Sequence, residues 1–406
     1  MKRFFAISTI AALITAGFVC FLTAVSSPAS AQSVESVFKG QRIIYPESSI
    51  PQPGRLHTNY FYVNSDQPSS GPNPFDETPG SVACVYQLVS GPTGCPIATS
   101  KTVPSGGIGA IALVDAGYYP TAQSDLDAFD AYFGIPATTV NQVWPGPTKP
   151  PSYSNWLLEE ALDIEWAHAM APQAKLFLVV SELCTAPQCT TDPTWQAVQL
   201  AGRLVAQNGG GVVSMSFGDA EITHERQLDQ FFTQSGVVYF AASGDSGIGV
   251  SIYPGSSPNV VSVGGTFFNR DRQGNFLNEV YGGGGGDLSP YEPRPAYQSG
   301  IAGIVGNHRG YPDVASDYCC AAVYLQGGWL DVGGTSWSSP TFAGIVNAAG
   351  SRLSSSVAQL TMMYNELANP IDYAADFNDV TSGDSRCAVG WDRCAGIGSP
   401  KTYAGK

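Results

Sequence analysis

Two carboxylic acids stand four residues apart in a stretch, residues 156–170, whose pattern predicts a helix. Glu159 and Asp163 would lie on one helical face, among apolar residues and without a nearby Lys or Arg. A solvated acidic stripe is the alternative, although such a stripe normally has interleaved Lys. Where water is excluded, like charges at this spacing are costly, and the two carboxylates would titrate as a coupled pair that can share a proton. Such a pair could act as a general base at acidic pH.

A second candidate is Ser336, which follows Gly333 and Gly334 and precedes Pro340 and an apolar run, residues 341–349. Two glycines favour a tight turn and Pro340 suits a first helical turn, so we predict that Ser336 lies at a helix N-terminus. The helix dipole there favours developing negative charge, as expected near a nucleophile. A Ser in this place is also common as a simple N-cap, and that alternative stays open.

A third candidate is Asp245, which follows the apolar strand predicted for residues 237–243 and has a glycine just before it. The segment Gly-Asp-Ser-Gly, residues 244–247, resembles the nucleophile loop of chymotrypsin-like proteases, which would make Ser246 the nucleophile. That family is all-β, whereas this chain alternates strands with helices. We therefore favour Asp245 as the side chain that points into a site, with a simple turn as the alternative.

Histidine, the base that a serine hydrolase needs at neutral pH, is poorly placed here. None of the chain's four histidines lies in a Gly-rich or triad-like context: His57, His168, His224 and His308. A histidine protonated in acid is no base, whereas a carboxylate with an ordinary pKa of about 4 can serve as one. The sequence therefore disfavours a His-dependent, subtilisin-type mechanism.

These candidates need a scaffold, and the chain after about residue 106 predicts one. Apolar strands are expected at residues 108–115, 175–181, 212–216, 237–243 and 260–263, with helices at 122–133, 156–170 and 195–207. Strands that are apolar throughout and separated by helices are typical of an α/β fold whose mostly parallel sheet has helices on both faces. We predict one large domain with its sites at the carboxyl ends of the strands.

Composition and charge narrow the function classes. The 406 residues are 43% hydrophobic and only 13% charged, and the net charge is -14. These values exclude a disordered polyampholyte, a collagen-like repeat and a coiled coil, and they argue against nucleic acid or an anionic membrane surface as a partner. An acidic working medium, which protonates many carboxylates, fits this charge better.

The first residues predict export. Lys2 and Arg3 precede an apolar run, residues 4–25, and Ala29-Ser30-Ala31 fits a signal peptidase site. We predict a signal peptide over residues 1–31 and a secreted protein, extracellular or periplasmic, with a membrane-spanning signal anchor as the alternative. Residues 32–105, rich in Pro, Ser, Asn and Gly, predict an extended arm.

Cysteine usage agrees with an oxidising compartment. Of nine cysteines, loss of Cys20 with the signal leaves an even number. The others lie close together in the sequence: Cys84 and Cys95, Cys184 and Cys189, Cys319 and Cys320, Cys387 and Cys394. Disulfides local to loops are the natural interpretation, with the connectivity left open. Zinc is less favoured because the chain has no Cys-x-x-Cys motif and no histidine next to a cysteine pair.

Taken in order, these motifs resemble the sedolisins, or serine-carboxyl peptidases, which are secreted acid proteases. The acidic stretch resembles their Glu-x-x-x-Asp helix, residues 243–245 their oxyanion Asp segment, and residues 334–340 their nucleophile motif. Further segments that fit the family are residues 253–258, 263–266, 282–286 and 311–315. The resemblance covers residues 107–400 and implies an α/β, subtilisin-like three-layer fold with a mostly parallel central sheet and helices on both faces.

The resemblance also implies roles. Ser336 would attack the scissile carbonyl, Glu159 would take its proton, and Asp163 would orient Glu159 and share its charge. Asp245, kept protonated, would donate to the oxyanion. The chain would then be a serine-type peptidase, an endopeptidase or a tripeptidyl-peptidase, acting at acidic pH on peptide or protein substrates as a monomer. The alternative is a secreted non-catalytic α/β protein that binds peptides or glycans, although a binding module has no reason to retain buried like charges.

A C-terminal stretch resembles the calcium loop of the same family. By that match, one structural Ca²⁺ would be held by the side chains of Asp379 and Asp392 and by the carbonyl oxygens of Val380, Ala388 and Gly390, a donor set that suits a hard cation. An acidic surface loop stapled by a disulfide is the alternative. Most sedolisins also carry a large folded pro-domain, which residues 32–105 are too few to form. We therefore expect a form without it, whose catalytic domain is residues 106–406, calcium loop included.

Overall fold

The computed structural model describes residues 34–52, 54–183, 193–351 and 354–406, which form one compact unit. The predicted signal peptide and the Cys184 and Cys189 pair lie outside these ranges. No helix within the described ranges has both the length and the apolar composition that a membrane crossing requires.

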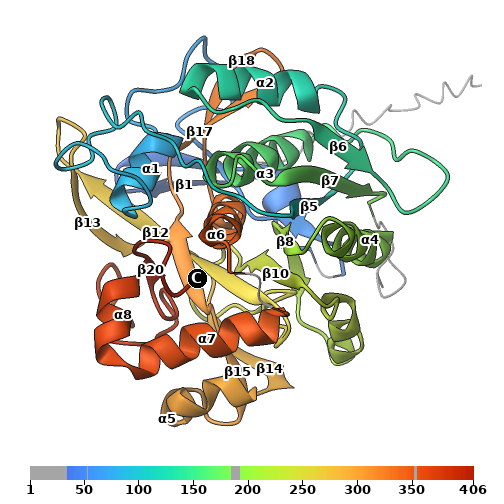
Figure 1. The fold of residues 1–406 in the computed structure, drawn as a ribbon, viewed down its shortest axis with the longest axis vertical. Coiled ribbons are helices and arrows are strands. Elements are labelled where there is room, and N and C mark those ends of the chain that lie inside the picture. Colours follow the sequence, from blue (N-terminus) through green and yellow to red (C-terminus); the bar gives the residue numbers. More distant parts are fainter. Residues whose placement is uncertain (1–33, 53, 184–192, 352–353) are drawn as a thin grey trace, which may run out of the picture. The chain divides into compact units, whose positions relative to one another are not determined.

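An eight-stranded sheet runs through the centre of the fold (Figure 1). Its order is β13-β12-β10-β8-β5-β7-β6, with β16 also paired to β12, and only β13 is antiparallel to its neighbour. The strands are β5 (Ala110–Ala116), β6 (Val140–Val143), β7 (Lys175–Ser181), β8 (Gly211–Met215), β10 (Val237–Ala242), β12 (Val261–Arg270), β13 (Phe276–Tyr281) and β16 (Val314–Asp317). The predicted, mostly parallel sheet is thus confirmed, with β12 running well beyond its predicted end.

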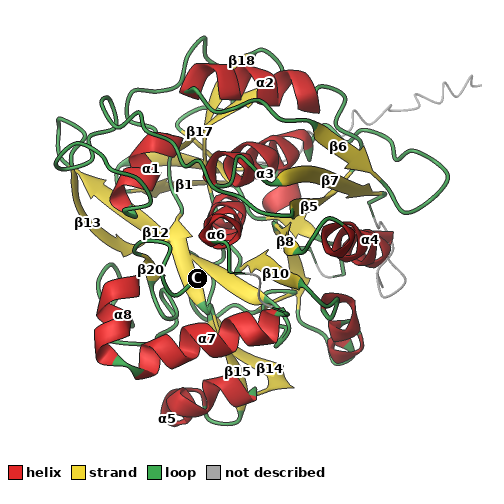
Figure 2. Cartoon of the chain, viewed as in Figure 1, coloured by secondary structure: helices red, strands yellow, loops and turns green. Residues whose placement is uncertain are grey.

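Helices cover both faces of this sheet (Figure 2). Alternate residues of β5 show the two layers, because Ile111 and Leu113 pack with α3 and α6 whereas Ala112 and Val114 pack with α4. The predicted helices are confirmed as α2 (Ala122–Phe133), α3 (Leu157–Met170) and α4 (Pro193–Gln207). The other elements are α5 (Ala302–Val305), α6 (Thr335–Ala349), α7 (Ser356–Ala368), α8 (Pro370–Asp376), β9 (Phe217–Ala220), β11 (Ile252–Tyr253), β14 (Asp287–Pro293), β15 (His308–Tyr311), β19 (Phe377–Asn378) and β20 (Ser399–Pro400).

Helix α6 begins earlier than its sequence indicates. We expected Pro340 in the first turn, but the helix starts at Thr335 and Pro340 lies inside it. Proline has no N–H, so it leaves the carbonyl oxygen of Ser336 without its helical partner. The hydroxyl of Ser216 lies 3.2 Å from that oxygen and can donate to it. A side chain outside the helix therefore makes the interior proline tolerable.

The segment ahead of the first core strand is more ordered than the extended arm that its composition predicted. It forms β1 (Val34–Phe38), β2 (Gln41–Tyr45), β3 (His57–Thr58), β4 (Phe61–Val63) and α1 (Pro79–Val85). Strands β1, β2 and β4 complete a five-stranded sheet with β18 (Gly328–Gly333) and β17 (Ala321–Leu325). Strands this short carry little periodicity, and their partners lie far along the chain, which is why composition alone missed them.

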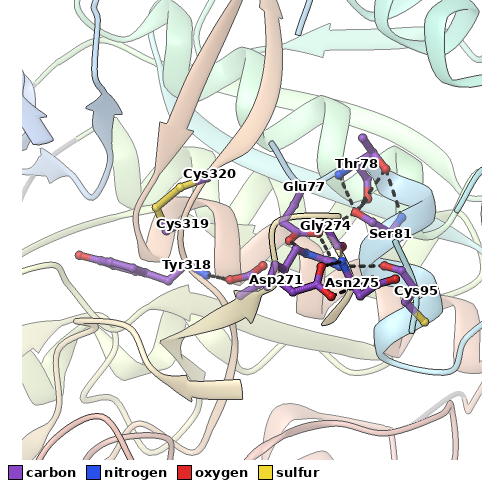
Figure 3. Close-up of polar contacts among 12 residues, drawn as sticks. Glu77, Thr78, Ser81, Cys95, Asp271, Gly274, Asn275, Tyr318, Cys319 and Cys320 are labelled. Carbon is purple, nitrogen blue, oxygen red and sulfur yellow. Dashed lines mark hydrogen bonds and ion pairs between the residues drawn. A yellow bond between two sulfur atoms is a disulfide. The ribbon is translucent and has the colours of Figure 1, made fainter. Parts of the chain in front are cut away.

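Arg270, at the end of β12, ties this N-terminal segment to the main sheet. Its guanidinium pairs with the Glu77 carboxylate and donates to the carbonyl oxygens of Cys95 at 2.7 Å and Gly274 at 2.8 Å. Figure 3 shows Glu77 and Ser81 beside Gly274 and Asn275 of the turn between β12 and β13. Local disulfides are confirmed for three of the expected pairs: Cys84–Cys95, Cys319–Cys320 and Cys387–Cys394.

Candidate active site

Ser336 is the second residue of α6, and strand β18 leads directly into this helix. Its backbone N–H donates to the carbonyl oxygen of Asn59 at 3.0 Å. At Gly334, where φ is 127°, an added Cβ would lie 2.1 Å from that oxygen and 2.7 Å from Asp245 Oδ2. Only glycine therefore lets a carbonyl oxygen approach the start of α6 from this side.

Glu159 and Asp163 lie one turn apart on α3, which packs against α6. Both side chains are fully buried. Trp166 of α3 and Trp337 of α6 meet edge to face with 4.8 Å between ring centroids, and Trp166 Nε1 also donates to a backbone carbonyl of β17. This ring pair fixes the helix that carries Ser336 against the acidic helix.

Ser216, between β8 and β9, links the two helices through hydrogen bonds. Ser336 Oγ donates to the Ser216 carbonyl oxygen at 3.0 Å, and Ser216 Oγ lies 2.6 Å from Asp163 Oδ1. One hydroxyl proton cannot serve both Asp163 and the Ser336 carbonyl oxygen. If Asp163 is protonated, it donates to Ser216 Oγ and the Ser216 proton satisfies the helix carbonyl, so this arrangement favours a protonated Asp163.

The acidic face of α3 has no cation to balance it. Within the described ranges no Lys or Arg forms an ion pair with Glu159 or Asp163. Burial raises the pKa of Glu159 well above its ordinary value, and the nearby Asp163 and Asp115 raise it further, while the neighbouring Ser336 hydroxyl lowers it. Burial, then Asp115, raises the pKa of Asp163 in the same direction. Two such groups share a proton readily in acid.

Three residues near this site were absent from the sequence-based candidates. Asp115 is the last but one residue of β5, is buried without a hydrogen-bond partner in the described residues, and has its pKa raised to about 7 by burial. Its place at the carboxyl end of a central strand was a usable signal. Ser216 and Asn59 gave no comparable signal, because one looks like any strand-end Ser and the other belongs to the supposed arm.

Asp245 follows β10 and lies against the start of α6. Its Oδ1 accepts hydrogen bonds from the Thr335 backbone N–H and hydroxyl, both at 2.9 Å, while Oδ2 has no partner in the described residues. Burial raises the pKa of Asp245 to about 7, against the lowering effect of Thr335. The structure thus brings Asp245, Glu159, Asp163 and Ser336 together. Ser246 is exposed, and no histidine ring hydrogen-bonds Ser336 in the described part of the chain.

The C-terminal acidic loop gathers oxygen atoms suited to a hard cation. Asp392 accepts backbone N–H groups of Ala388, Cys394 and Ala395, and Asp379 accepts the N–H of Gly390 at 3.0 Å. Neither carboxylate has an ion pair among the described residues. The carbonyl oxygens of Val380, Ala388 and Gly390 accept no hydrogen bond from any residue that the structure describes. This donor set fits a calcium ion.

Comparisons with known proteins agree with this arrangement. The model of the subtilase family matches residues 157–364, which run from α3 to α7. Kumamolisin of Bacillus sp. (strain MN-32) is 29% identical over 80% of this chain and 62% of its own length. Tripeptidyl-peptidase 1 of Dictyostelium discoideum is 27% identical over 68% of this chain and 50% of its own length. The chain thus spans about half to two thirds of the length of these relatives.

A solved structure gives the same answer about the fold. The Pseudomonas sedolisin, a serine-carboxyl proteinase in complex with two molecules of pseudo-iodotyrostatin, superimposes with a TM-score of 0.64 at 23% identity. The match covers 80% of this chain and 95% of that one. The chain therefore belongs to the subtilase family, and the resemblance to the sedolisins expected from its motifs is confirmed.

Proposed function

We propose that this chain is a serine-carboxyl peptidase that hydrolyses peptide bonds in acid. The observation that carries the proposal is the pair of buried, uncompensated carboxyls on α3, held against the helix that begins at Ser336. Its relatives include peptidases by name, such as kumamolisin and tripeptidyl-peptidase 1. A purely structural acidic pair would gain nothing from being buried without a cation.

In this mechanism Ser336 Oγ attacks the scissile carbonyl and its proton passes to Glu159. Asp163 holds the proton that the pair shares, so that Glu159 remains ionised and able to accept. The Ser336 N–H and a protonated Asp245 then donate to the oxyanion. The absence of a side chain at Gly334 leaves room for that oxygen. Glu159 returns its proton to the leaving amine, and water attacks the acyl-enzyme by the same route.

The pH dependence follows from Asp245. Its pKa is raised to about 7, so the carboxyl is neutral and able to donate below that pH. As the pH rises through about 7 it ionises and repels the oxyanion that it should stabilise. Activity should therefore be high in acid and decline near neutrality.

The first test is hydrolysis of an unfolded protein substrate from about pH 3 to 8 by the intact chain and by Ser336→Ala. We expect a maximum in acid and no activity in the variant. Folded protein that is inactive at every pH would instead favour the non-catalytic peptide- or glycan-binding protein.

Calcium binding and export complete the proposal. Asp379, Asp392 and the carbonyl oxygens of Val380, Ala388 and Gly390 would hold one Ca²⁺, which would supply positive charge to tether the loop. A chelator should then lower the melting temperature, and added Ca²⁺ should restore it, whereas an unchanged melting curve would contradict the site.

Local disulfides support an exported, extracellular or periplasmic protein. Mass spectrometry of the exported protein would test cleavage after Ala31.

A further inference from the structure

The turn that leads into α6 is held by the backbone of Tyr318. The Gly334 N–H donates to the Tyr318 carbonyl oxygen at 2.7 Å, and Gly334 stands two residues before Ser336. An added Cβ at Gly333 would also lie 2.7 Å from that oxygen. The direction of the Ser336 N–H, one of the two proposed oxyanion donors, therefore depends on where Tyr318 lies.

Tyr318 also lies beside the other proposed donor, Asp245. Its side chain is buried between two glycine segments, so that an added Cβ would lie 2.4 Å from its ring at Gly265 and 3.1 Å from its hydroxyl oxygen at Gly283. Burial, and then the nearby charge of Asp245, raise the pKa of Tyr318 well above its ordinary value. A movement of Tyr318 would therefore disturb both donors.

A disulfide between neighbouring residues, Cys319–Cys320, follows Tyr318 directly (Figure 3). A cross-link restrains an unfolded chain less as the loop that it closes becomes shorter. Cys84–Cys95 and Cys387–Cys394 join residues that are 11 and 7 positions apart, whereas this disulfide joins residues that are 1 position apart. Of the three disulfides in the described residues, this one should therefore stabilise the whole fold least.

The disulfide restrains the backbone locally instead. Cys320 has a φ of 78°, in the left-handed region that is unfavourable for a residue with a side chain. Its carbonyl oxygen accepts the Glu77 N–H at 2.6 Å, and Glu77 forms the ion pair with Arg270. A ring closed through two neighbouring side chains limits the rotations of the peptide between them. It therefore holds Cys320 in this conformation and fixes Tyr318, which comes just before the ring.

We propose that the Cys319–Cys320 disulfide is a redox-sensitive positioning element for the two oxyanion donors. This inference rests on the proposed peptidase function. When oxidised, the pair keeps the Tyr318 carbonyl oxygen in place for the Gly334 N–H. A small dithiol reduces it by closing into its own cyclic disulfide, so that two electrons and two protons pass to the cysteine sulfurs and two thiols result. Cys320 is then free to leave the left-handed region, and the Ser336 N–H is no longer held toward the oxyanion.

A cavity of about 350 Å³ gives small reagents access to this disulfide. Cys319 and Cys320 line it together with Lys39 and Phe75, which are both exposed, so the cavity opens to solvent. The two cysteines themselves are 2% and 6% exposed, so we expect a small dithiol to reach them and a folded protein thiol not to. The charge of Lys39 favours the thiolate form of the attacking reagent.

The first test is the double variant Cys319→Ser with Cys320→Ser, which keeps the size of both side chains but cannot form the cross-link. Initial rates over a range of concentrations of an unfolded protein substrate give kcat and KM. We expect kcat to fall about tenfold with KM unchanged, a smaller loss than the roughly 10²–10³-fold that follows removal of a donor outright. Cys84→Ser with Cys95→Ser is the matched control, and it should lower the melting temperature more and kcat less.

Hydrogen exchange of the Gly334 N–H reports on the same turn without any activity. We expect this exchange to be about tenfold faster in the double variant, because the acceptor oxygen of Tyr318 is less fixed. The N–H groups in the middle of α3 should exchange at the wild-type rate, which would establish that the fold as a whole has not loosened.

Reduction of the wild type tests the redox sensitivity. The folded chain is treated with dithiothreitol near pH 8, where thiolates form, and is then assayed in acid. Mass spectrometry of an alkylated sample measures the reduced fraction of Cys319 and Cys320. Hydrolysis should fall as this fraction rises and should recover on re-oxidation, whereas the double variant should not respond to the reagent.

The outcomes separate this inference from the function on which it rests. An active wild type beside a double variant with the same kcat and the same exchange at Gly334 overturns the positioning role and leaves the peptidase function standing. A loss of kcat equal to that of the Cys84 and Cys95 control also overturns it, because the disulfide then acts only through stability. A folded wild type that hydrolyses nothing and does not react with a serine-directed phosphonate overturns both.

Discussion

Two buried acidic sites in this fold differ in how their charge is balanced. Asp313 lies in a fully buried pair with Arg309, which donates to Oδ1 at 2.8 Å and to Oδ2 at 2.5 Å. Tyr364 and the Ser262 N–H add two further hydrogen bonds, each at 2.9 Å. Glu159 and Asp163, equally buried, have no cation, and their carboxyl oxygens make a single hydrogen bond, between Asp163 and the Ser216 hydroxyl, in the described residues.

The difference indicates what each site is for. A buried carboxylate that only supports the fold is stable when its lone pairs and charge are satisfied, as those of Asp313 are. A carboxyl that must exchange a proton is better left near the balance between its two forms. The fold therefore carries an energetic cost on α3 that it avoids at Asp313, and this contrast can be tested by removing one group at a time.

The largest effect should come from Glu159→Gln, which removes the proposed base but keeps the shape of the side chain. We expect the rate of acid hydrolysis to fall by about 10²–10⁴-fold. The free energy of unfolding at neutral pH should not fall, because a neutral amide replaces a carboxyl that is buried without a cation. Rates on an unfolded protein substrate and urea unfolding would measure both.

Glu165→Gln is the matched control for that experiment. Glu165 lies on the same helix and is equally buried, but its Oε2 accepts the Tyr324 N–H at 3.0 Å and it has no contact with Ser336. It should retain most of the activity. Equal losses in the two variants would mean that the whole acidic helix acts as a structural unit, and the contrast with Asp313 would fail.

The opposite result is expected at the compensated site. Arg309→Met would leave Asp313 buried without its partner, which costs about 3–5 kcal/mol in the free energy of unfolding. Arg393→Met is the control, because the pair of Arg393 with Asp287 is 3.0 Å long and partly exposed, and losing a surface pair costs at most about 1 kcal/mol. Urea unfolding of the two variants measures the two losses in the free energy of unfolding. Similar losses would argue against a special role for the buried pair of Arg309 and Asp313.

The same contrast explains how far the sequence could be interpreted. Helices α2 and α3 and strand β7 were predicted to within one residue, because long apolar patterns and the stop at Gly134 are local signals. The acids on α3 stood out because no Lys or Arg accompanied them. Asn59 could not be recognised in the sequence. Its position depends on the pairing of the flanking strands β3 and β4 with β9 and β18, which lie far along the chain. The position of Pro340 misled the prediction because the helical hydrogen bond that proline cannot make is replaced by one from Ser216, which lies between β8 and β9.

A smaller effect should appear in the pH profile of Asp245→Asn. In the wild type, burial raises the pKa of Asp245 to about 7, so activity should fall about tenfold per pH unit above that value as one proton is lost. An Asn at this position can still donate a hydrogen bond but cannot ionise. The decline near pH 7 should therefore disappear in the variant, whereas an unchanged profile would assign the decline to another group.

The smallest effect concerns stability and comes from Asp115, the third acid near the pair. Its pKa is raised by burial from 3.8 to about 7, so the folded chain binds more protons than the unfolded chain between these values. That contribution to stability is fully present below about pH 3.8 and is lost as the pH rises through about 7.

Asp115→Asn should therefore make the fall in unfolding free energy between pH 4 and 7 shallower, by at most about 1.4 kcal/mol per pH unit. Asp271→Asn is the control, because Asp271 lies on an exposed turn where hydrogen bonds from Asn275 lower its pKa, so that it titrates below this range. Urea unfolding at several pH values measures both slopes. If Asp115→Asn leaves the slope unchanged, Asp115 has a partner in the folded protein. The charge of the acids near Ser336 would then be better balanced than their lack of ion pairs indicates.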